Sequence, residues 1–453
     1  MQFKPVYDKG FMPMINALRQ FRKEVSSEGG KPVKICVERN GGYNYIYEIE
    51  IFANEAKNEQ SYAMVERIVK AALWVVGGYK IYIQGSEYIA NRLKADYTEG
   101  GKRFFDADFM AGVYEKPFEV VFCDAESFPA LNKCSMKVGG NLDGCRIGFD
   151  AGGSDRKVSA VIDGVPVYSE EVVWHPKTQS DPQYHYDGIL AAMKTAASKM
   201  PRVDAIGVSS AGVYVDNKIM VASLFLKVPK DEFEKRVKTM YIDIAKEFGC
   251  PLEVANDGDV TSLAGAMDLN DTEILGIAMG TSEAGGYING EGGLNGWLSE
   301  LAFVPVDFNT DAMVDEWSGD YGCGVKYFSQ DSVIKLAESA GVRFEDGLSP
   351  AEKLKKVQGM MGDGSGIAEQ IFHDIGVYLG YTLPFYAEFY DIKHVLLLGR
   401  VTSGLGGDIV IATAREVLEK EFPEYAGFKL EMPDESNRRV GQSIAAASLP
   451  KIG

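Results

Sequence analysis

Apolar and polar residues alternate near the start of the chain and then give way to helical spacing. Residues 33–52 alternate on both sides of an Asn-Gly-Gly turn at 40–42, which predicts a β-hairpin. Apolar positions over 59–76 recur with the period of a helix, and the apolar run over 80–85 predicts a buried strand. The order of hairpin, helix and strand indicates an α/β unit.

A stretch rich in turn-forming residues, 124–144, follows this unit and predicts a linker. We therefore expect residues 1–140 to form an N-terminal α/β domain of their own. The order of elements within 33–98 faintly matches that of the next part of the chain, which leaves open a degenerate copy of the same sheet unit.

From residue 145 onward, predicted strands alternate with longer helical segments. Residues 145–174 predict three strands, joined by a glycine turn and by a tight turn at Asp163-Gly164. Further apolar runs predict strands, and helical spacing fills the gaps between them: strands within 203–215, 251–257, 274–292 and 394–398, and helices over 187–199, 231–248 and 367–390. Hairpins interspersed with crossover helices indicate an α/β fold with mixed sheets.

Charge and cysteine usage exclude several classes of protein. The 453 residues carry 47 Lys and Arg against 65 Asp and Glu, a formal charge of −18, whereas duplex DNA and anionic membranes attract basic surfaces. The sequence shows no export signal and no apolar run of the roughly 18–20 residues that a membrane span needs. Its six scattered cysteines are typical of reduced thiols. We expect a soluble cytoplasmic protein that binds neither nucleic acid nor membranes.

Three glycine loops follow apolar strands, at the strand ends where α/β sheets bind ligands. The first contains Asp150, Gly152, Gly153 and Ser154. Its glycines allow successive backbone N–H groups to form an anion-binding nest. Asp150 would hold Mg²⁺ or its waters, and Ser154 and Lys157 would face phosphate. The alternative is an ordinary glycine hairpin with a capping Asp.

The second loop contains Asn256 and Asp257, after a strand and at the start of a helix. A carboxylate in this place is well positioned to accept a proton from a substrate hydroxyl, and the helix dipole favours its ionised form. The alternative is simple helix capping by Asp257 or Asp259.

The third loop contains Gly280, Thr281 and Ser282. Its N–H groups and hydroxyls suit the β- and γ-phosphates of a nucleotide, and the alternative is another hairpin turn. Glu283 is unusual beside such a loop, because its carboxylate would repel a γ-phosphate unless Mg²⁺ or Lys157 offsets it.

A fourth loop, with Gly399, Ser403 and Gly404, leaves the strand 394–398 and starts a helix, where an adenosine would fit. The order of these elements resembles the ROK family, which comprises sugar kinases and related transcriptional repressors of the actin/sugar-kinase superfamily. The motifs that carry the resemblance are Asp-x-Gly-Gly-Ser at 150–154, Gly-Val-Ser-Ser-Ala-Gly at 207–212, Asn-Asp at 256–257, Gly-Thr-Ser at 280–282 and the loop from Gly399.

The resemblance covers about residues 145–450 and implies a two-lobed actin-like, ribonuclease H-like ATPase fold with mixed sheets. Residues 141–255 would form the first lobe. Residues 256–453 would form the second lobe, with a C-terminal helix that returns to the first. Residues 1–140 fall outside the resemblance, and their role is unknown, although they can be a degenerate ribonuclease H-like unit.

By the same resemblance, Asp257 matches the catalytic base that deprotonates a sugar hydroxyl for attack on the γ-phosphate of ATP. Asn256 and Glu300 match sugar-binding residues. The nucleotide would lie against two phosphate loops and an adenosine motif: Asp150, Gly152, Gly153 and Ser154; Gly280, Thr281 and Ser282; and Gly399, Ser403 and Gly404.

The sequence departs from the family pattern at two places. Phe303 stands where the family has a histidine that touches both sugar and zinc. The family's zinc segment corresponds to residues 316–323, in which Cys323 is the one cysteine that remains. Because a structural zinc needs four good ligands, we expect no structural zinc.

We therefore expect ATP-dependent phosphoryl transfer to a hydroxyl of a hexose or related carbohydrate, with ATP and Mg²⁺ as cofactors and sugar and nucleotide as small-molecule partners. The resemblance also allows a homodimer. One alternative is a catalytically weak or silent sugar- or nucleotide-binding sensor or scaffold of the same fold. Another is an ATPase coupled to a partner through residues 1–140. The mixed α/β pattern of those residues argues against the helix-turn-helix of the repressor branch.

Overall fold

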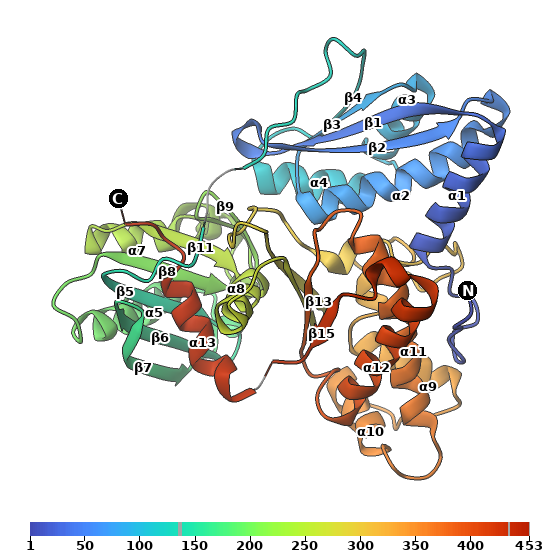
Figure 1. Ribbon diagram of the computed structural model, residues 1–453. Coiled ribbons are helices and arrows are strands. Elements are labelled where there is room, and N and C mark those ends of the chain that lie inside the picture. The colour runs from blue at the N-terminus through green and yellow to red at the C-terminus, as the bar shows by residue number, and fades with distance from the viewer. Residues whose placement is uncertain (135–137, 434, 453) are drawn as a thin grey trace. The chain divides into compact units, whose positions relative to one another are not determined.

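The computed structural model describes residues 1–134, 138–433 and 435–452, and the chain divides into two compact units (Figure 1). Each unit is discontinuous in sequence. The first comprises Met1–Cys134, Ile277–Gly285 and Trp297–Met432, and the second Ser135–Gly276, Gly286–Gly296 and Pro433–Gly453.

The first unit begins with a four-stranded sheet of order β2-β1-β3-β4. Strands β1 (Gly30–Glu38) and β2 (Asn44–Phe52) pair antiparallel, which confirms the predicted hairpin, and the two glycines at the end of its turn have φ angles of 68° and 73°. Strand β3 (Lys80–Gln84) pairs antiparallel with β1, and β4 (Glu119–Cys123) pairs parallel with β3.

Helices accompany this sheet: α1 (Met14–Glu28), α2 (Asn58–Val76), α3 (Glu87–Asp96) and α4 (Phe104–Tyr114). Figure 1 shows α2 and α4 along one face of the sheet. Every residue of α2 from Met64 to Val76 is buried, including Glu66, Arg67 and Lys70. A helix that is buried on all sides must have partners on all sides, so α2 contacts more than the sheet beneath it.

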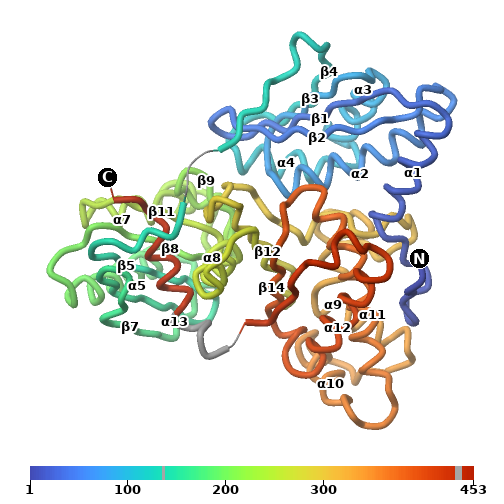
Figure 2. Tube along the Cα trace, in the orientation of Figure 1, coloured from blue at the N-terminus to red at the C-terminus, as the bar shows by residue number. Residues whose placement is uncertain are grey.

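The first unit also contains most of a second sheet, of order β13-β12-β14-β15 (Figures 1 and 2). Its strands are β12 (Ile274–Met279), β13 (Glu283–Ile288), β14 (His394–Leu398) and β15 (Lys429–Glu431). Strands β14 and β15 are parallel. The helices of this part are α9 (Gln330–Ser339), α10 (Pro350–Gly359), α11 (Ile367–Tyr386) and α12 (Leu405–Glu421), and α11 packs against α12.

The second unit is built on a five-stranded sheet of order β11-β8-β5-β6-β7. Strands β5 (Cys145–Ala151), β6 (Asp155–Ile162) and β7 (Val165–Val173) form an antiparallel meander. Strand β8 (Ala205–Ser210) pairs parallel with β5, and β11 (Leu252–Asn256) pairs parallel with β8. The strand after the meander is thus parallel to its neighbour, whereas β3 in the first unit is antiparallel to β1.

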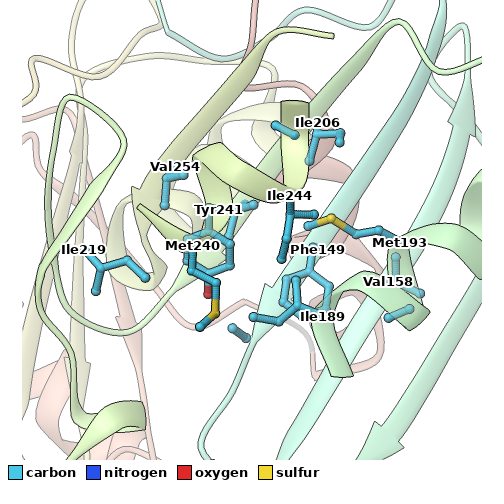
Figure 3. Packing of buried hydrophobic residues seen from close by; sticks show 14 of the residues in the cluster. Phe149, Val158, Ile189, Met193, Ile206, Ile219, Met240, Tyr241, Ile244 and Val254 are labelled. Carbon is cyan, nitrogen blue, oxygen red and sulfur yellow. The ribbon is translucent and has the colours of Figure 1, made fainter. Parts of the chain in front are cut away.

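Helices and a small hairpin complete the second unit: α5 (Pro182–Ala197), the hairpin of β9 (Val213–Val215) and β10 (Lys218–Val221), α6 (Lys230–Glu232), a π-helical turn (Phe233–Val237), α7 (Met240–Phe248), α8 (Asp257–Leu269) and α13 (Glu435–Ala447). Phe149 and Val158 of the sheet pack with Ile189 and Met193 of α5 and Ile244 of α7 (Figure 3). This apolar cluster supports the strands whose ends carry the candidate site.

Helix α13 contacts β5, β6, β8 and α8 within the second unit. Gly148 and Gly207 allow this approach, because a Cβ at either position would overlap a backbone carbonyl of the helix, that of Ser443 or Ala446. Of the helices that the structure describes, none combines the length and the apolar character needed to traverse a lipid bilayer.

Candidate functional site

Three parallel strands of the second unit bring polar side chains to one edge of its sheet. The pairing register places Asp150, near the end of β5, beside Ser209 of β8, and Ser210 beside Asn256 at the end of β11. Adjacent strands lie about 4.8 Å apart, so residues from distant parts of the sequence become neighbours at this edge.

Asp150 is held by contacts on both carboxylate oxygens. The Ser209 hydroxyl donates to Oδ1 at 2.8 Å, and the Lys157 ammonium lies 3.6 Å from Oδ2. Lys157 is also 3.6 Å from Asp155, so its charge is shared between two carboxylates. Burial raises the pKa of Asp150, and the Lys157 charge opposes that effect. The predicted phosphate-facing lysine is therefore also the counter-ion of Asp150.

The first glycine loop forms the tight connection between β5 and β6. The Trp174 indole N–H donates to the Gly152 carbonyl at 2.8 Å, and the Trp174 backbone N–H donates to the Ser154 carbonyl at 3.1 Å. A Cβ at Gly153 would lie 2.9 Å from Cε of Lys177. Lys177 is thus a second lysine beside this loop. Sequence reasoning missed it, because it belongs to no motif and lies more than twenty residues away.

Asn256 and Asp257 begin helix α8 and have different tasks. Asn256 is the N-cap residue, and its Oδ1 accepts the Gly258 N–H at 2.8 Å while its Nδ2 donates to the Gly212 carbonyl at 2.7 Å. Asn256, rather than Asp257 or Asp259, is therefore the N-cap residue, although Asp257 Oδ1 also accepts the Gly258 N–H, at 3.1 Å. Asp259 instead accepts the backbone N–H of Tyr287 at 3.2 Å. Asn256 makes the shorter bond to the Gly258 N–H, so the helix start does not depend on the Asp257 carboxylate alone.

The surroundings of Asp257 favour the protonated form of its carboxyl group. Burial raises its pKa to about 6, the Asp150 carboxylate contributes in the same direction, and the Gly258 N–H opposes both. A carboxylate with a pKa in this range is ionised at pH 7.5 and is a stronger base than an ordinary Asp. Within the second unit, the arrangement can therefore accept a proton beside a second acidic group.

The third loop, at 280–282, and the fourth loop, from Gly399 to Gly404, are neighbours in the first unit. The Val401 N–H donates to the Met279 carbonyl at 3.0 Å, and the Arg400 guanidinium donates to the Thr281 hydroxyl at 3.3 Å. Thr281 and Ser282 are exposed. Arg400 was not singled out from the sequence, although it lies inside the loop from Gly399 to Gly404, because its partner is 119 residues away.

The fourth loop depends on a glycine in the left-handed region of backbone conformation. Gly399 has a φ of 97°, and a Cβ there would overlap the Met279 carbonyl. Ser403 donates its hydroxyl to the Arg400 carbonyl at 2.8 Å and is contacted by Gln358 at 3.2 Å. Gly404, with a φ of 68°, immediately precedes helix α12. The loop is thus held close to the end of β12.

Glu283 does not point its carboxylate into solvent beside the third loop. Its side chain is only 2% exposed, and the Tyr386 hydroxyl donates to Oε1 at 3.2 Å. Burial raises its pKa to about 8, and the charge of Glu300 adds to that shift. The expected repulsion of a γ-phosphate is thus much reduced, because the carboxyl is buried and favours its neutral form.

Glu300 lies in the first unit, in the segment 297–303. Its backbone N–H donates to the Trp74 carbonyl at 3.1 Å. Phe303 packs on the Trp74 ring, with the two ring centroids 4.2 Å apart. Phe303 is therefore part of an aromatic cluster that joins this segment to helix α2.

The segment 315–323, which includes the residues that the resemblance aligns with a zinc segment, is held by hydrogen bonds and ion pairs. Asp315 accepts the Ser318 backbone N–H and hydroxyl, both at 2.7 Å. Cys323 is buried, and burial raises the pKa of its thiol to about 11. Within the described part of the chain, no group of three or more His, Cys, Asp or Glu side chains is arranged to hold a metal ion.

The structure thus gathers the predicted residues into two groups. Asp150, Gly152, Gly153, Ser154, Lys157, Asn256 and Asp257 lie in the second unit, and Gly280, Thr281, Ser282, Glu300, Gly399, Ser403 and Gly404 in the first. Asp150 and Asp257 lie close enough for their charges to interact, and the loops at 280–282 and 399–404 are in contact. That the two groups meet around one nucleotide stays a prediction.

Comparison with known proteins places the chain. The sequence matches the ROK family over residues 146–437. The crystal structure of the ROK hexokinase from Thermus thermophilus aligns with a TM-score of 0.53 and 17% identity, over 67% of this chain and 97% of that one. A ROK family transcriptional regulator, a homolog of the E. coli MLC protein, aligns with a TM-score of 0.51 and 17% identity, over 68% of this chain and 79% of that one. The sequence matches none of the curated proteins.

Structural likenesses with TM-scores of 0.53 and 0.51 at 17% sequence identity establish the fold alone. The chain has the mixed α/β, actin-like sugar kinase fold that was expected, with a further α/β part before the matched residues. The matched segment spans well over half of the chain. The protein therefore belongs to the ROK family.

Proposed function

We propose that this protein transfers the γ-phosphoryl group of ATP to a hydroxyl of a hexose or a related carbohydrate. The observation that carries the proposal is the placement of Asp257: it is the first residue of helix α8, it follows the N-cap residue Asn256, it lies near Asp150, and its pKa is raised to about 6. The name of the similar hexokinase supports a hexose as the class of acceptor.

In the proposed reaction, the Asp257 carboxylate accepts the proton of the sugar hydroxyl. The hydroxyl oxygen forms a bond to the γ-phosphorus while the bond from that phosphorus to the bridging oxygen of ADP breaks. Phosphoryl transfer demands little covalent participation from the protein, so its task is to orient the reactants and to neutralise charge. A base with a pKa near 6 receives the proton more readily than an ordinary carboxylate.

The residues around Asp150 fit a magnesium ion bound through water. Mg²⁺ commonly keeps several waters and takes one or two carboxylates together with substrate phosphates, so the single carboxylate of Asp150 suffices. When bound, the ion would neutralise the phosphate charge that develops in the transition state. Lys157 and Lys177 bring further positive charge to the same loop.

The loops of the first unit supply what a nucleotide requires. The exposed hydroxyls of Thr281 and Ser282 can donate to phosphate oxygens, and the Arg400 guanidinium beside them carries a fixed positive charge. We assign the adenosine to the loop from Gly399 to Gly404, and the sugar to Asn256 and Glu300, as the family resemblance implies.

The decisive experiment replaces Asp257 by Asn and measures transfer from ATP to a panel of hexoses. We expect turnover to fall on the order of 10²–10⁴-fold, because the amide cannot accept the proton, while nucleotide affinity changes little. Asp259→Asn is the matched control, since it removes the same charge from the same helix turn. Equal turnover in the Asp257 variant and the control would contradict the assignment of the base.

A binding protein without transfer activity is the second candidate, and the replacement of the histidine by Phe303 favours it. The same experiment separates the two. If the unaltered protein binds a sugar and ATP but transfers no phosphate to any hexose, the sensor or scaffold is supported and the kinase is not. For such a protein Asp257→Asn would leave ligand affinity nearly unchanged.

A further inference from the structure

The last turn of helix α2 is hydrogen-bonded to the segment 297–303, which contains Glu300. The backbone N–H groups of Leu298, Ser299 and Glu300 donate in succession to the carbonyls of Val76, Val75 and Trp74, at 3.2, 2.9 and 3.1 Å. These carbonyls belong to the last turn of α2, where the helix has no N–H donors of its own to offer them. The segment therefore caps the helix, and the helix in turn fixes three consecutive peptide groups of the segment.

Aromatic rings fasten the two ends of the same segment. Phe303 packs on Trp74, whose indole N–H donates to Asp106 at 2.9 Å and whose ring also lies 5.0 Å from that of Phe109. At the other end, the Trp297 ring is 5.5 Å from the ring of Tyr45 in strand β2. Both anchors come from the N-terminal part of the chain.

The segment has a conformation that needs such support. Ser299 is a buried residue with a φ of 49°, in the left-handed region that non-glycine residues seldom adopt. The Tyr390 hydroxyl donates to its Oγ at 3.2 Å. On the opposite side, a Cβ at Gly285 of strand β13 would lie 2.6 Å from the Ser299 carbonyl oxygen. The backbone at 299 is therefore closely confined.

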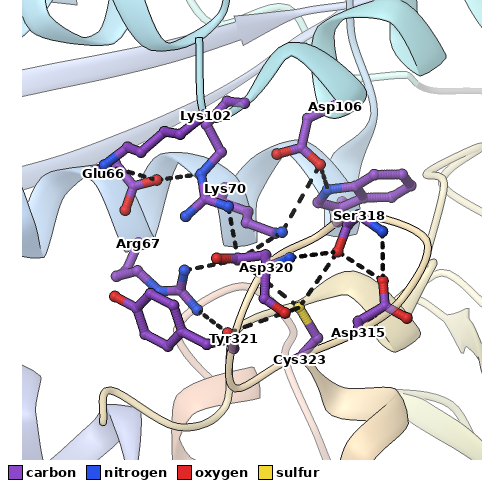
Figure 4. Close-up of polar contacts among 12 residues, drawn as sticks. Glu66, Arg67, Lys70, Lys102, Asp106, Asp315, Ser318, Asp320, Tyr321 and Cys323 are labelled. Atoms are coloured by element: carbon purple, nitrogen blue, oxygen red, sulfur yellow. Dashed lines mark hydrogen bonds and ion pairs between the residues drawn. The ribbon is translucent and has the colours of Figure 1, made fainter. Parts of the chain in front are cut away.

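A second attachment of α2 centres on one buried carboxylate, that of Asp320 (Figure 4). Arg67, Lys70 and Arg103 approach its Oδ2 at 2.8, 2.7 and 2.8 Å. Arg67 also donates to the Tyr321 carbonyl at 2.8 Å. These charges hold the pKa of Asp320 well below its usual range. Three cations on one anion require further carboxylates, and Glu66 pairs with Arg103 while Asp106 lies 3.8 Å from Lys70.

The Asp320 attachment is connected back to the Glu300 segment through the backbone. The Val306 N–H donates to the Gly322 carbonyl at 2.8 Å, and the Gly324 N–H donates to the Val304 carbonyl at 2.9 Å. Residues 304–306 directly follow the segment 297–303. The loop that contains Asp320 is therefore connected by two backbone hydrogen bonds to the residues that directly follow the segment 297–303.

We propose that α2 is a positioning element of the acceptor site: it holds the segment 297–303, and with it Glu300, in a geometry that binds a hexose. The proposal rests on the proposed function for the identity of the ligand. It gives the N-terminal part of the chain a role in sugar affinity, through residues that do not touch the sugar. Arg67, Lys70, Trp74 and Asp320 are positioning residues in this sense.

The test compares Asp320→Asn with Asp315→Asn in the full-length protein. Asp315 lies in the same loop but bonds to Ser318 rather than to α2 (Figure 4), so it is a matched control. We expect faster hydrogen exchange at the amides of 298–300 in the Asp320 variant alone. Its affinity for glucose, measured calorimetrically with a nonhydrolysable ATP analogue present, should fall about tenfold or more, because a small misplacement of binding groups is costly. The KM for ATP should change less than about twofold.

Phe303→Leu provides an independent variant that keeps every buried charge, should the Asp320 variant fail to fold. It should weaken glucose affinity in the same direction. Unchanged exchange at 298–300, or equal losses of affinity for glucose and ATP, would overturn the positioning role. If the unaltered protein binds none of the hexoses tested, the proposed function and the acceptor part of this proposal both fall, while the exchange rates still decide whether α2 holds the segment.

Discussion

The substitution Asp257→Asn should make the protein more stable at neutral pH while it removes transfer activity. Burial and the neighbouring Asp150 raise the pKa of Asp257 from 3.8 to about 6, so the fold disfavours the ionised form. A raised pKa of an acid means that the folded state keeps a proton that the unfolded chain has already released. The free energy of unfolding is therefore highest with respect to this group at low pH, and it falls as the pH rises from about 4 to about 6.

The expected gain follows from the size of that pKa difference. Each pKa unit corresponds to about 1.4 kcal/mol, which sets a ceiling of about 3 kcal/mol at pH 7.5. Partial exposure of the side chain screens its charge, so we expect about 1–2 kcal/mol. The amide oxygen that the substitution introduces can still accept the Gly258 N–H, so no helix contact is lost.

Thermal melting at pH 7.5 and pH 5.0 measures the effect. For a unit of this size, each kcal/mol shifts the melting temperature by about 2–4 °C. The variant should therefore melt several degrees above the unaltered protein at pH 7.5. At pH 5.0 the difference in melting temperature should be about half as large. Asp259→Asn controls for the loss of one charge at the helix start. A variant that melts lower than the unaltered protein at pH 7.5 would refute the reasoning, and so would a difference that grows as the pH falls.

Other predictions concern single contacts. Asp320→Asn should destabilise the first unit by about 3–5 kcal/mol, because it leaves buried cations without their common partner. Asp315→Asn should cost about 1–2 kcal/mol. Thermal melting of both variants checks this prediction, and equal losses of stability would contradict it. Arg400→Ala should raise the KM for ATP about tenfold and leave the KM for sugar unchanged, by loss of a charged hydrogen bond, which steady-state kinetics measures. Gly399→Ala should destabilise by about 1–3 kcal/mol because of its positive φ and the nearby Met279 carbonyl, and an unaltered melting temperature would show that the loop adapts.

Local signals in the sequence predicted much of the fold. The Asn-Gly-Gly turn specified the first hairpin because its two glycines have positive φ, and Asp163-Gly164 did so for the second, with φ angles of 48° and 80°. The helix predicted over 59–76 is observed at Asn58–Val76. The expected position of the first two loops at strand ends is also observed, since Asp150 lies near the end of β5 and Asp257 directly follows β11.

The contacts that hold the segment 297–303 were not predictable in this way. Charged residues on a helix are typical of an exposed face, whereas Arg67 is buried and pairs with Asp320, 253 residues away. The same applies to Arg400 and Thr281. Capping of α2 by Leu298 and its neighbours uses backbone groups, which leave no trace in side-chain patterns. Such pairings depend on tertiary structure rather than on spacing.

The burial of the ionic cluster around Asp320 bears on the conditions under which the protein holds together. Mobile ions screen charges that face water, but they reach a buried carboxylate much less, so moderate salt should leave this attachment intact. The hydration that charged groups forgo on burial is worth less in hot water than in cold. The link between α2 and Asp320 should therefore retain its strength on warming better than exposed ion pairs in the same chain do.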